Sequence, residues 1–358
     1  MAKDKKLTKD LVWGKRKSKK WIIISVVAVV IVAAAVGYII FGLDVSDQVS
    51  NKSGGSTGES GLVARAIDGV LVPAEESNYY PVAVVIENLV VSRPQSGLAG
   101  ANIVYEALAE GGITRFLAIY AGQTVGTIGP VRSARPYFVD WVLEYNALYV
   151  HAGGSPQSLS DIRQNDVFDL NQFFNSQYYW RDTTLNVASE HTLFTSGEKM
   201  TFALRDLEAP EEGDYQSWKY KEEVKKSARP VEEKNIIIDF SSFSYNVEYK
   251  YDPNANEYLR YMAGEIHKDK DGTAIRPKNV IVQKVKTRLA DEIRLAMDTV
   301  GEGDAIIFRD GVATVGTWEK KSKTDRTIFS DMDGSEIELN PGSTWIEVVP
   351  TDREIVYN

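Results

Sequence analysis

The sequence predicts an α/β N-terminal domain with a mixed sheet and a smaller β-rich (α+β) C-terminal domain, behind a single N-terminal transmembrane helix. Three observations support this prediction. An uncharged apolar run fills residues 21–41, strand and helix patterns alternate over residues 81–164, and short strands between turn residues dominate from residue 235 onward. The chain has 358 residues, 43% hydrophobic and 25% charged, which is enough for two domains of ordinary globular composition.

The apolar run at residues 21–41 predicts a membrane anchor, because a helix of that length spans a hydrocarbon layer of roughly 30 Å. The basic head at residues 1–20 carries nine Lys or Arg and two Asp, and positive flanks stay in the cytoplasm. We therefore expect a single-pass protein of the cell membrane, with a cytoplasmic N-terminus and its C-terminal domains outside. Ala33 and Ala35 also fit the cleavage site of a signal peptide, but the run continues for six residues beyond Ala35.

The distribution of charge limits the partners of the folded part. The basic head has a net charge of +7, so the rest of the chain carries −16 of the overall −9. An acidic body argues against nucleic acid as a partner. The sequence contains no cysteine, so it forms no disulfide and offers no thiol for a lipid anchor.

Composition divides the exported part into four segments. Residues 42–64 predict a flexible stalk, 65–207 the α/β domain, 208–234 a charged linker and 235–358 the β-rich domain. The expected elements are strands at 81–88, 115–122 and 147–154, helices at 97–112 and 134–146, a helix that begins at Ser155 or Pro156, and one helix near 288–299. Pairs such as Asp310-Gly311 predict turns between the later strands.

The stretch "IGPVRSARPYFVDW" places Arg132 and Arg135 beside the start of the second expected helix. Ser133 is expected to cap this helix, with Pro136 in its first turn. Guanidinium groups at a helix N-terminus suit a carboxylate or phosphate ligand. The alternative is that each arginine pairs with an internal acid and ties the fold together.

The stretch "YVHAGGSPQSLSDI" ends a strand at His151 and opens a helix at Ser155, the place where open α/β sheets bind ligands. Ser155 is expected to cap the helix as well as to border a ligand, and it lacks the G-x-S-x-G context of a nucleophile. His151 is a candidate general base, or a hydrogen-bonded packing residue. Glu106 and Glu110, one turn apart on the expected first helix, are candidates for acid–base work on a glycoside, and Arg115 could neutralise one of them.

The stretch "YYWRDTTLNVASEHTLFTS" adds three candidate ligand-binding residues, Arg181, Asp182 and His191. Tyr179 and Trp180 beside them suit stacking on sugars, and suit core packing equally. Neither H-x-H nor H-E-x-x-H spacing occurs, so no metal site and no cofactor is predicted.

Several long motifs carry a resemblance to a known family. "RPQSGLAGANIVYEALAEGGITRFLAIY", "IGPVRSARPYFVDW", "YVHAGGSPQS", "YWRD" and "GSTWIEVVP" resemble the YerB-like family of Gram-positive envelope proteins, over residues 65–352. The resemblance implies an N-terminal domain with these motifs and a separate β-rich C-terminal domain. Family members are typically surface lipoproteins, so here the transmembrane anchor would replace the missing lipid-bearing cysteine. No activity follows from the resemblance.

Two functions fit these features. In the first, the protein binds, and processes as a glycan hydrolase or lyase, an anionic envelope polymer such as peptidoglycan or teichoic acid. Arg132 and Arg135 would hold the anion, and His151 or Glu106 would transfer protons. In the second, it is a non-catalytic, membrane-tethered scaffold for another envelope protein. The two differ in whether these four residues meet in one cleft.

Overall fold

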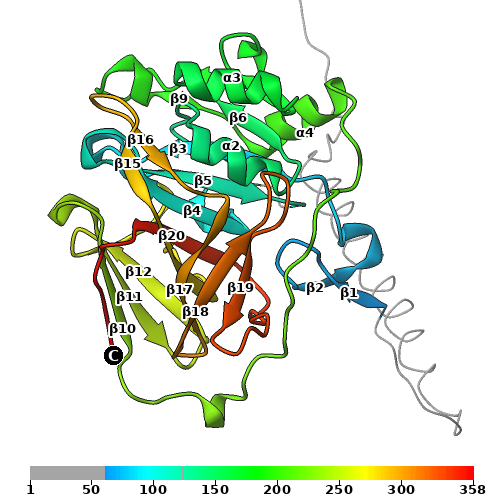
Figure 1. Ribbon diagram of the computed structural model, residues 1–358. Helices are drawn as coiled ribbons and strands as arrows, with labels where there is room; N and C mark the ends of the chain where they lie inside the picture. Colours follow the sequence, from blue (N-terminus) through cyan, green and yellow to red (C-terminus); the bar gives the residue numbers. More distant parts are fainter. Residues whose placement is uncertain (1–60, 123–124) are drawn as a thin grey trace, which may run out of the picture. The chain divides into compact units, whose positions relative to one another are not determined.

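The computed structural model describes residues 61–122 and 125–358 (Figure 1). The basic head, the membrane anchor and most of the stalk fall on residues 1–60 and lie outside the described residues. In the described part, no helix is both long and apolar enough to cross a bilayer.

The fold is mostly sheet, and its largest sheet has ten strands in the order β19-β18-β17-β14-β20-β4-β5-β3-β6-β7. The strands of the first half of the chain are β3 (Val82–Glu87), β4 (Ile103–Leu108), β5 (Thr114–Tyr120), β6 (Leu148–His151) and β7 (Asp169–Asn171). Those of the second half are β14 (Asn279–Val285), β17 (Gly301–Arg309), β18 (Val312–Lys320), β19 (Ile328–Asp331) and β20 (Thr344–Pro350). The sheet contains both parallel and antiparallel strand pairs, so it is mixed, as predicted.

The two halves of the chain share this sheet. Strand β20 pairs in parallel with β4, with Thr344 opposite Ile103 and Val348 opposite Ala107. The segment 208–234, expected as a linker, also packs against the second half: the Trp218 indole is buried and donates a hydrogen bond to the Thr327 carbonyl.

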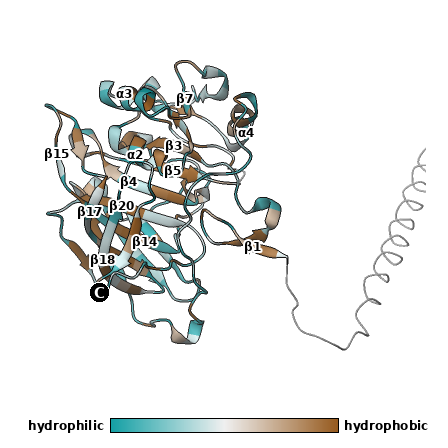
Figure 2. Ribbon diagram, turned by 45° about the vertical axis from the view of Figure 1, so that its right-hand side comes forward, coloured by the Kyte–Doolittle hydropathy of each residue, from teal (hydrophilic) through white to brown (hydrophobic). Residues whose placement is uncertain are grey.

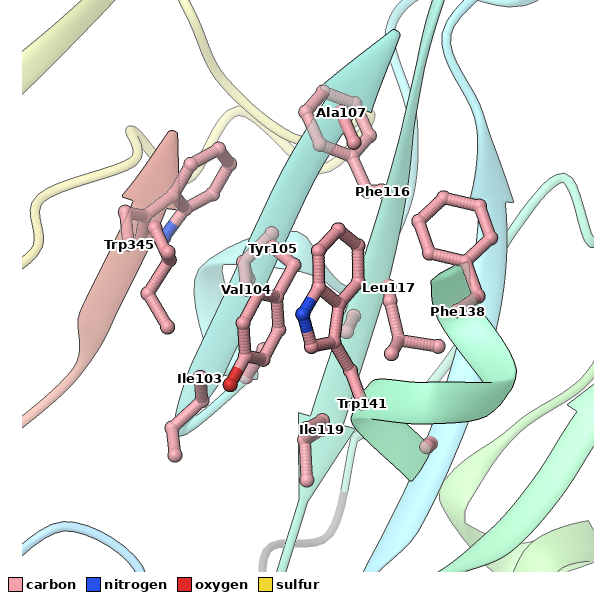
Figure 3. Packing of buried hydrophobic residues seen from close by; sticks show 14 of the residues in the cluster. Ile103, Val104, Tyr105, Ala107, Phe116, Leu117, Ile119, Phe138, Trp141 and Trp345 are labelled. Atoms are coloured by element: carbon pink, nitrogen blue, oxygen red, sulfur yellow. The ribbon is translucent and has the colours of Figure 1, made fainter. Parts of the chain in front are cut away.

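Within the described residues, three α-helices accompany the sheet: α2 (Pro136–Leu143), α3 (Pro156–Gln164) and α4 (Gly197–Asp206). Helix α2 places Trp141 against Tyr105 of β4, with the ring centroids 4.7 Å apart and nearly parallel (Figure 3). Apolar colouring is concentrated in the central strands β3 and β5, which are buried along their whole length (Figure 2). Burial on both faces explains why these strands read as continuous apolar runs.

A second, five-stranded antiparallel sheet has the order β13-β12-β11-β10-β21. Its strands are β10 (Asn235–Asp239), β11 (Asn246–Asp252), β12 (Glu257–Met262), β13 (Glu265–Ile266) and β21 (Ile355–Tyr357). Burial alternates along β11 and β12, as expected for a sheet with one face against the core. The part of the chain that the structure describes also has three short strand pairs: β1 (Leu62–Ala64) with β2 (Leu71–Pro73), β8 (Trp180–Arg181) with β9 (Leu193–Phe194), and β15 (Thr287–Leu289) with β16 (Leu295–Met297).

Most predicted elements are confirmed, and two helices are wrong. The expected helix at 97–112 is strand β4 between short 3₁₀ turns, because a strand buried on both faces shows no alternation that separates it from a helix. The expected helix near 288–299 is the β15–β16 hairpin, and the described residues 235–358 contain no α-helix. The Asp310-Gly311 turn is confirmed: both residues have positive φ, as a two-residue hairpin between β17 and β18 requires.

A buried arginine joins the two sheets. Arg260 of β12 is fully buried and forms an ion pair with Glu106 of β4, while its Nε lies 3.6 Å from Glu347 of β20. The Tyr249 hydroxyl accepts a hydrogen bond from Arg260 Nε at 3.0 Å and donates one to Glu347. His267 Nδ1 accepts from the same guanidinium, and its Nε2 donates to Gln95 at 3.2 Å.

The buried cluster around Arg260 contains one cation and two carboxyl groups, those of Glu106 and Glu347. Glu106 and Glu347 are register neighbours on parallel strands. Burial and the charge of Glu106 raise the pKa of Glu347 to about 8, so Glu347 is protonated at neutral pH. Burial and the nearby Arg260 charge hold the pKa of His267 well below its ordinary value, so this ring is neutral. The single charged pair in the cluster is therefore Arg260 with Glu106.

Replacing Arg260 should destabilise the protein strongly. We expect Arg260→Met to lower the free energy of unfolding by about 3–5 kcal/mol, because it leaves a buried carboxylate without its partner. The measurement is urea unfolding at neutral pH. Glu347→Gln, which imitates the protonated acid, is the matched control and should change the stability by less than about 1 kcal/mol. Equal losses in both variants would contradict this assignment of charge.

Candidate functional site

A cleft of about 640 Å³ lies where the two halves of the chain meet. Four segments line it: residues 96–100, residues 125–127, the β8–β9 hairpin and residues 269–273. Gly97 permits the close approach of the first two segments. It has a φ of 89°, and a Cβ there would lie 2.8 Å from the Thr127 carbonyl oxygen.

The β8–β9 hairpin supplies an aromatic wall. Trp180 is paired with Phe194 across the hairpin, so both rings lie on one face, with centroids 6.2 Å apart and an interplanar angle of 28°. Phe194 is buried, whereas Trp180 is only half-buried. The exposed part of the indole is therefore available to a ligand in the cleft.

The loop from the second half of the chain supplies the opposing polar groups. Asp269 is 5% exposed and accepts hydrogen bonds from the backbone N–H groups of Leu98, at 3.1 Å, and Ala99, at 2.9 Å. Lys270 N–H donates to the Gln95 carbonyl at 2.7 Å. These bonds fix the loop against the N-terminal segment and with it the width of the cleft.

Two carboxylates in the cleft have opposite pKa shifts. Burial raises the pKa of Asp269 to about 6, although the backbone N–H groups of Ala99 and Leu98 oppose this shift. Hydrogen bonds from the hydroxyl and N–H of Thr184 lower the pKa of Asp182, whose carboxylate also lies 3.4 Å from the Lys270 ammonium. Asp182 is therefore ionised throughout the neutral range, whereas Asp269 exchanges its proton near pH 6.

The structure places Arg132 and Arg135 outside this cleft, in internal ion pairs. Arg132 pairs with buried Glu87 and Arg135 with Glu110, which corresponds to the alternative in which the arginines tie the fold together. Their predicted ligand roles stay predictions. The expected cap at Ser133 is wrong: Arg135 is the N-cap residue and helix α2 starts at Pro136. A residue before proline is held in an extended conformation, which prevents an earlier start.

Neither predicted catalytic residue lines the cleft. Glu106 is fully buried among Arg260, Thr114 and Asn88, and lies in a strand rather than on a helix face shared with Glu110. His151 is fully buried at the end of β6; its ring contacts the Gly153 carbonyl at 2.7 Å and the Asp169 carboxylate at 2.5 Å.

Among the predicted ligand-binding residues, Asp182 lines the cleft. Ser155 caps helix α3 by accepting the Ser158 N–H at 3.1 Å, which confirms the predicted cap. Arg181 is exposed and donates to the Ser189 carbonyl, and His191 is buried 3.3 Å from both Ser92 Oγ and Glu87 Oε2. The catalytic hypothesis required four residues to meet in one cleft. None of the four lines this cleft: Arg132, Arg135, His151 and Glu106. No group of three His, Cys, Asp or Glu that could hold a metal occurs within residues 61–122 and 125–358.

Sequence reasoning missed Asp269 as a site residue. It lies in "GEIHKDKDG", whose Asp271-Gly272 pair indicates a turn, and Asp271 does bind the Thr273 N–H at 2.9 Å. The N–H groups that hold Asp269 are about 170 residues away in the sequence. No local pattern could reveal this contact.

The pKa shift of Asp269 predicts a pH dependence of stability. The folded protein holds this proton up to about pH 6, whereas an unfolded aspartate loses it near its ordinary value of 3.8. Stability should therefore fall as the pH rises from about 4 to about 6, by up to about 3 kcal/mol from this group. Urea unfolding of the wild type and Asp269→Asn across this range measures the difference, with exposed Asp352→Asn as the control. A difference that does not vary with pH would contradict the shift.

Comparisons with known proteins identify the family. The "Protein of unknown function (DUF3048)" N-terminal domain matches residues 69–209, and the corresponding C-terminal domain matches residues 236–346. "Putative lipoprotein YerB" of Bacillus subtilis (strain 168) is 32% identical over 282 residues, which cover 75% of this chain and 81% of that protein. The crystal structure of the YerB protein from Bacillus subtilis superposes with a TM-score of 0.73 at 30% identity, over 82% of this chain and 99% of that one. The chain therefore belongs to the YerB-like family and has its two-domain, mostly sheet fold.

Proposed function

We propose that this chain is a membrane-anchored envelope protein that binds a cell-wall glycan, or a fragment of one, in the cleft. The observation that carries the proposal is the half-exposed Trp180 facing a set of fixed polar groups. The apolar run at residues 21–41 and the relative named as a putative lipoprotein support the address in the envelope.

The surface of the cleft suits a sugar. A pyranose ring has an apolar C–H face that packs on an aromatic ring and a rim of hydroxyl groups that donate hydrogen bonds. Trp180 offers the aromatic face, and the carboxylates of Asp182 and Asp271 offer acceptors whose positions are fixed by their own hydrogen bonds. The volume lies within the range of about 300–1,000 Å³ that small ligands occupy in proteins.

The charge of the cleft favours one of the expected polymers over the other. Three carboxylates, those of Asp182, Asp269 and Asp271, line it together with one ammonium group, that of Lys270. A polyphosphate chain such as teichoic acid would meet repulsion there. The uncharged sugar faces of a peptidoglycan strand would not, and they are therefore the favoured ligand.

The two carboxylates with opposite pKa shifts also bear on catalysis. Glycoside cleavage uses one carboxyl group that is protonated and one that is ionised, set apart by their environments. Asp269 and Asp182 have this relation near pH 6. The function we propose is binding of the glycan. Cleavage is tested separately, by looking for glycan fragments released in the binding assay described below.

Trp180→Ala should weaken binding to the glycan. We expect the full chain, purified in detergent, to be retained on isolated cell-wall sacculi, and the variant to bind about tenfold more weakly, because it loses about 1–2 kcal/mol of aromatic contact. Phe202→Ala is the matched control, since that ring is exposed on α4 and does not line the cleft. Equal retention of all three proteins would overturn the proposal and favour the scaffold function.

Mass spectrometry of the supernatant tests for cleavage. Defined fragments that appear with the wild type and not with Asp269→Asn would make the cleft a catalytic site. Retention without fragments would leave it a binding site.

A further inference from the structure

Three guanidinium groups gather where strand β3 of the ten-stranded sheet ends and helix α2 begins. Arg115 lies on β5, in register with Glu87 of β3, and Arg132 and Arg135 lie in the segment that enters α2. Two largely buried carboxylates face them, Glu87 at 2% and Glu110 at 23% exposed. A third acid, Glu190, is 3.7 Å from Arg132 but is 62% exposed and contributes little.

One carboxylate serves two of these arginines. Glu110 contacts Arg115 Nη2 through Oε2 at 3.1 Å and Arg135 through Oε1. The remaining Arg135 nitrogen, Nη1, donates to the Ala134 carbonyl at 2.7 Å. The Glu110 carboxylate is therefore in direct contact with both guanidinium groups.

Arg115 is left with unused donors. Its side chain is 9% exposed, and its Nε and Nη1 are buried without a hydrogen-bond partner among the described residues. A buried N–H group without a partner costs about 1–3 kcal/mol, and more when the group is charged. Burial and repulsion from Arg135 also lower the pKa of Arg115, consistent with a cation that lacks sufficient negative charge nearby.

We propose that Arg115 and Arg135 form a binding site for a single oxyanion group, a carboxylate or a phosphate, and that Glu110 occupies this site when no ligand is bound. The ligand anion would take the place of the Glu110 carboxylate. Two planar guanidinium groups present paired N–H donors in the geometry that such groups bind.

The surroundings fit an exchange of this kind. The site lies at the carboxyl end of β3, and ligands of α/β folds bind at the carboxyl ends of strands. It also lies next to the N-terminus of α2, where free backbone N–H groups attract anions. Glu110 is partly exposed and begins a three-residue turn in which Gly111 and Gly112 have φ values of 64° and 75°. Its side chain can therefore leave toward solvent without moving a strand. The inference does not depend on the glycan, because none of these residues lines the cleft.

Removing the internal carboxylate tests the site. The full chain in nonionic detergent is titrated with inorganic phosphate, acetate and chloride at constant ionic strength, and thermal unfolding is followed by tryptophan fluorescence. We expect Glu110→Gln to unfold at a lower temperature than the wild type without added anion. Phosphate or acetate, but not chloride, should restore it, with an apparent Kd about tenfold tighter than in the wild type. The more effective of the two identifies the ligand group as a phosphate or a carboxylate.

Two further variants make the result specific. Glu110→Gln combined with Arg115→Gln should lose the restoration, because the fork that binds the anion is gone. Asp298→Asn is the control, because it removes the carboxylate from an exposed ion pair with Arg288. Its unfolding temperature should respond to the added anions as that of the wild type does. Equal responses of Glu110→Gln and Asp298→Asn to phosphate and acetate, or no response in Glu110→Gln while its near-UV spectrum stays native, would overturn the proposal.

Discussion

The buried guanidinium of Arg260 is the contact on which the rest of this structure depends. It reaches from the five-stranded sheet to carboxylates on two neighbouring strands of the ten-stranded sheet, one from each half of the chain. The cost of burying the Arg260–Glu106 ion pair is offset only when both partners are in place, so the contact specifies one arrangement of the two sheets. A second buried cluster has two cations for one carboxylate: Glu144, which follows α2, forms ion pairs with Lys320 and Arg326. These two cations lower the pKa of Glu144 despite its burial.

The cleft is a consequence of this arrangement. His267, which contacts Arg260, is followed two residues later by Asp269, so the loop that lines the cleft starts from the buried cluster. The Gln95 side-chain oxygen accepts a hydrogen bond from the other nitrogen of the same imidazole, and the next residue, Ser96, also lines the cleft. The cluster thus holds two of the four lining segments through hydrogen bonds, and the position of the candidate ligand site follows from the packing of the core.

The two candidate sites differ in charge but share their supporting segments. The stretch 125–135 lines the acidic cleft at its beginning and carries Arg132 and Arg135 at its end. The β8–β9 hairpin contributes Trp180 to the cleft, while Glu190 and His191 of its loop lie near Arg132 and Glu87.

Local chemistry determined a large part of this protein in advance. Pro136 and the Ser155-Pro156 pair mark helix starts, Asp310-Gly311 marks a hairpin, and the β-branched run at Val82–Glu87 marks a strand, because each depends on neighbouring residues alone. The segment 97–112 could not be assigned in this way, since burial on both faces removes the periodicity that distinguishes strand from helix. Only the tertiary structure decided that Glu106 belongs to the core and Asp269 to a cleft. Their partners, Arg260 and the N–H groups of Leu98 and Ala99, lie more than 150 residues away, and contacts at that separation are set by how the sheets pack.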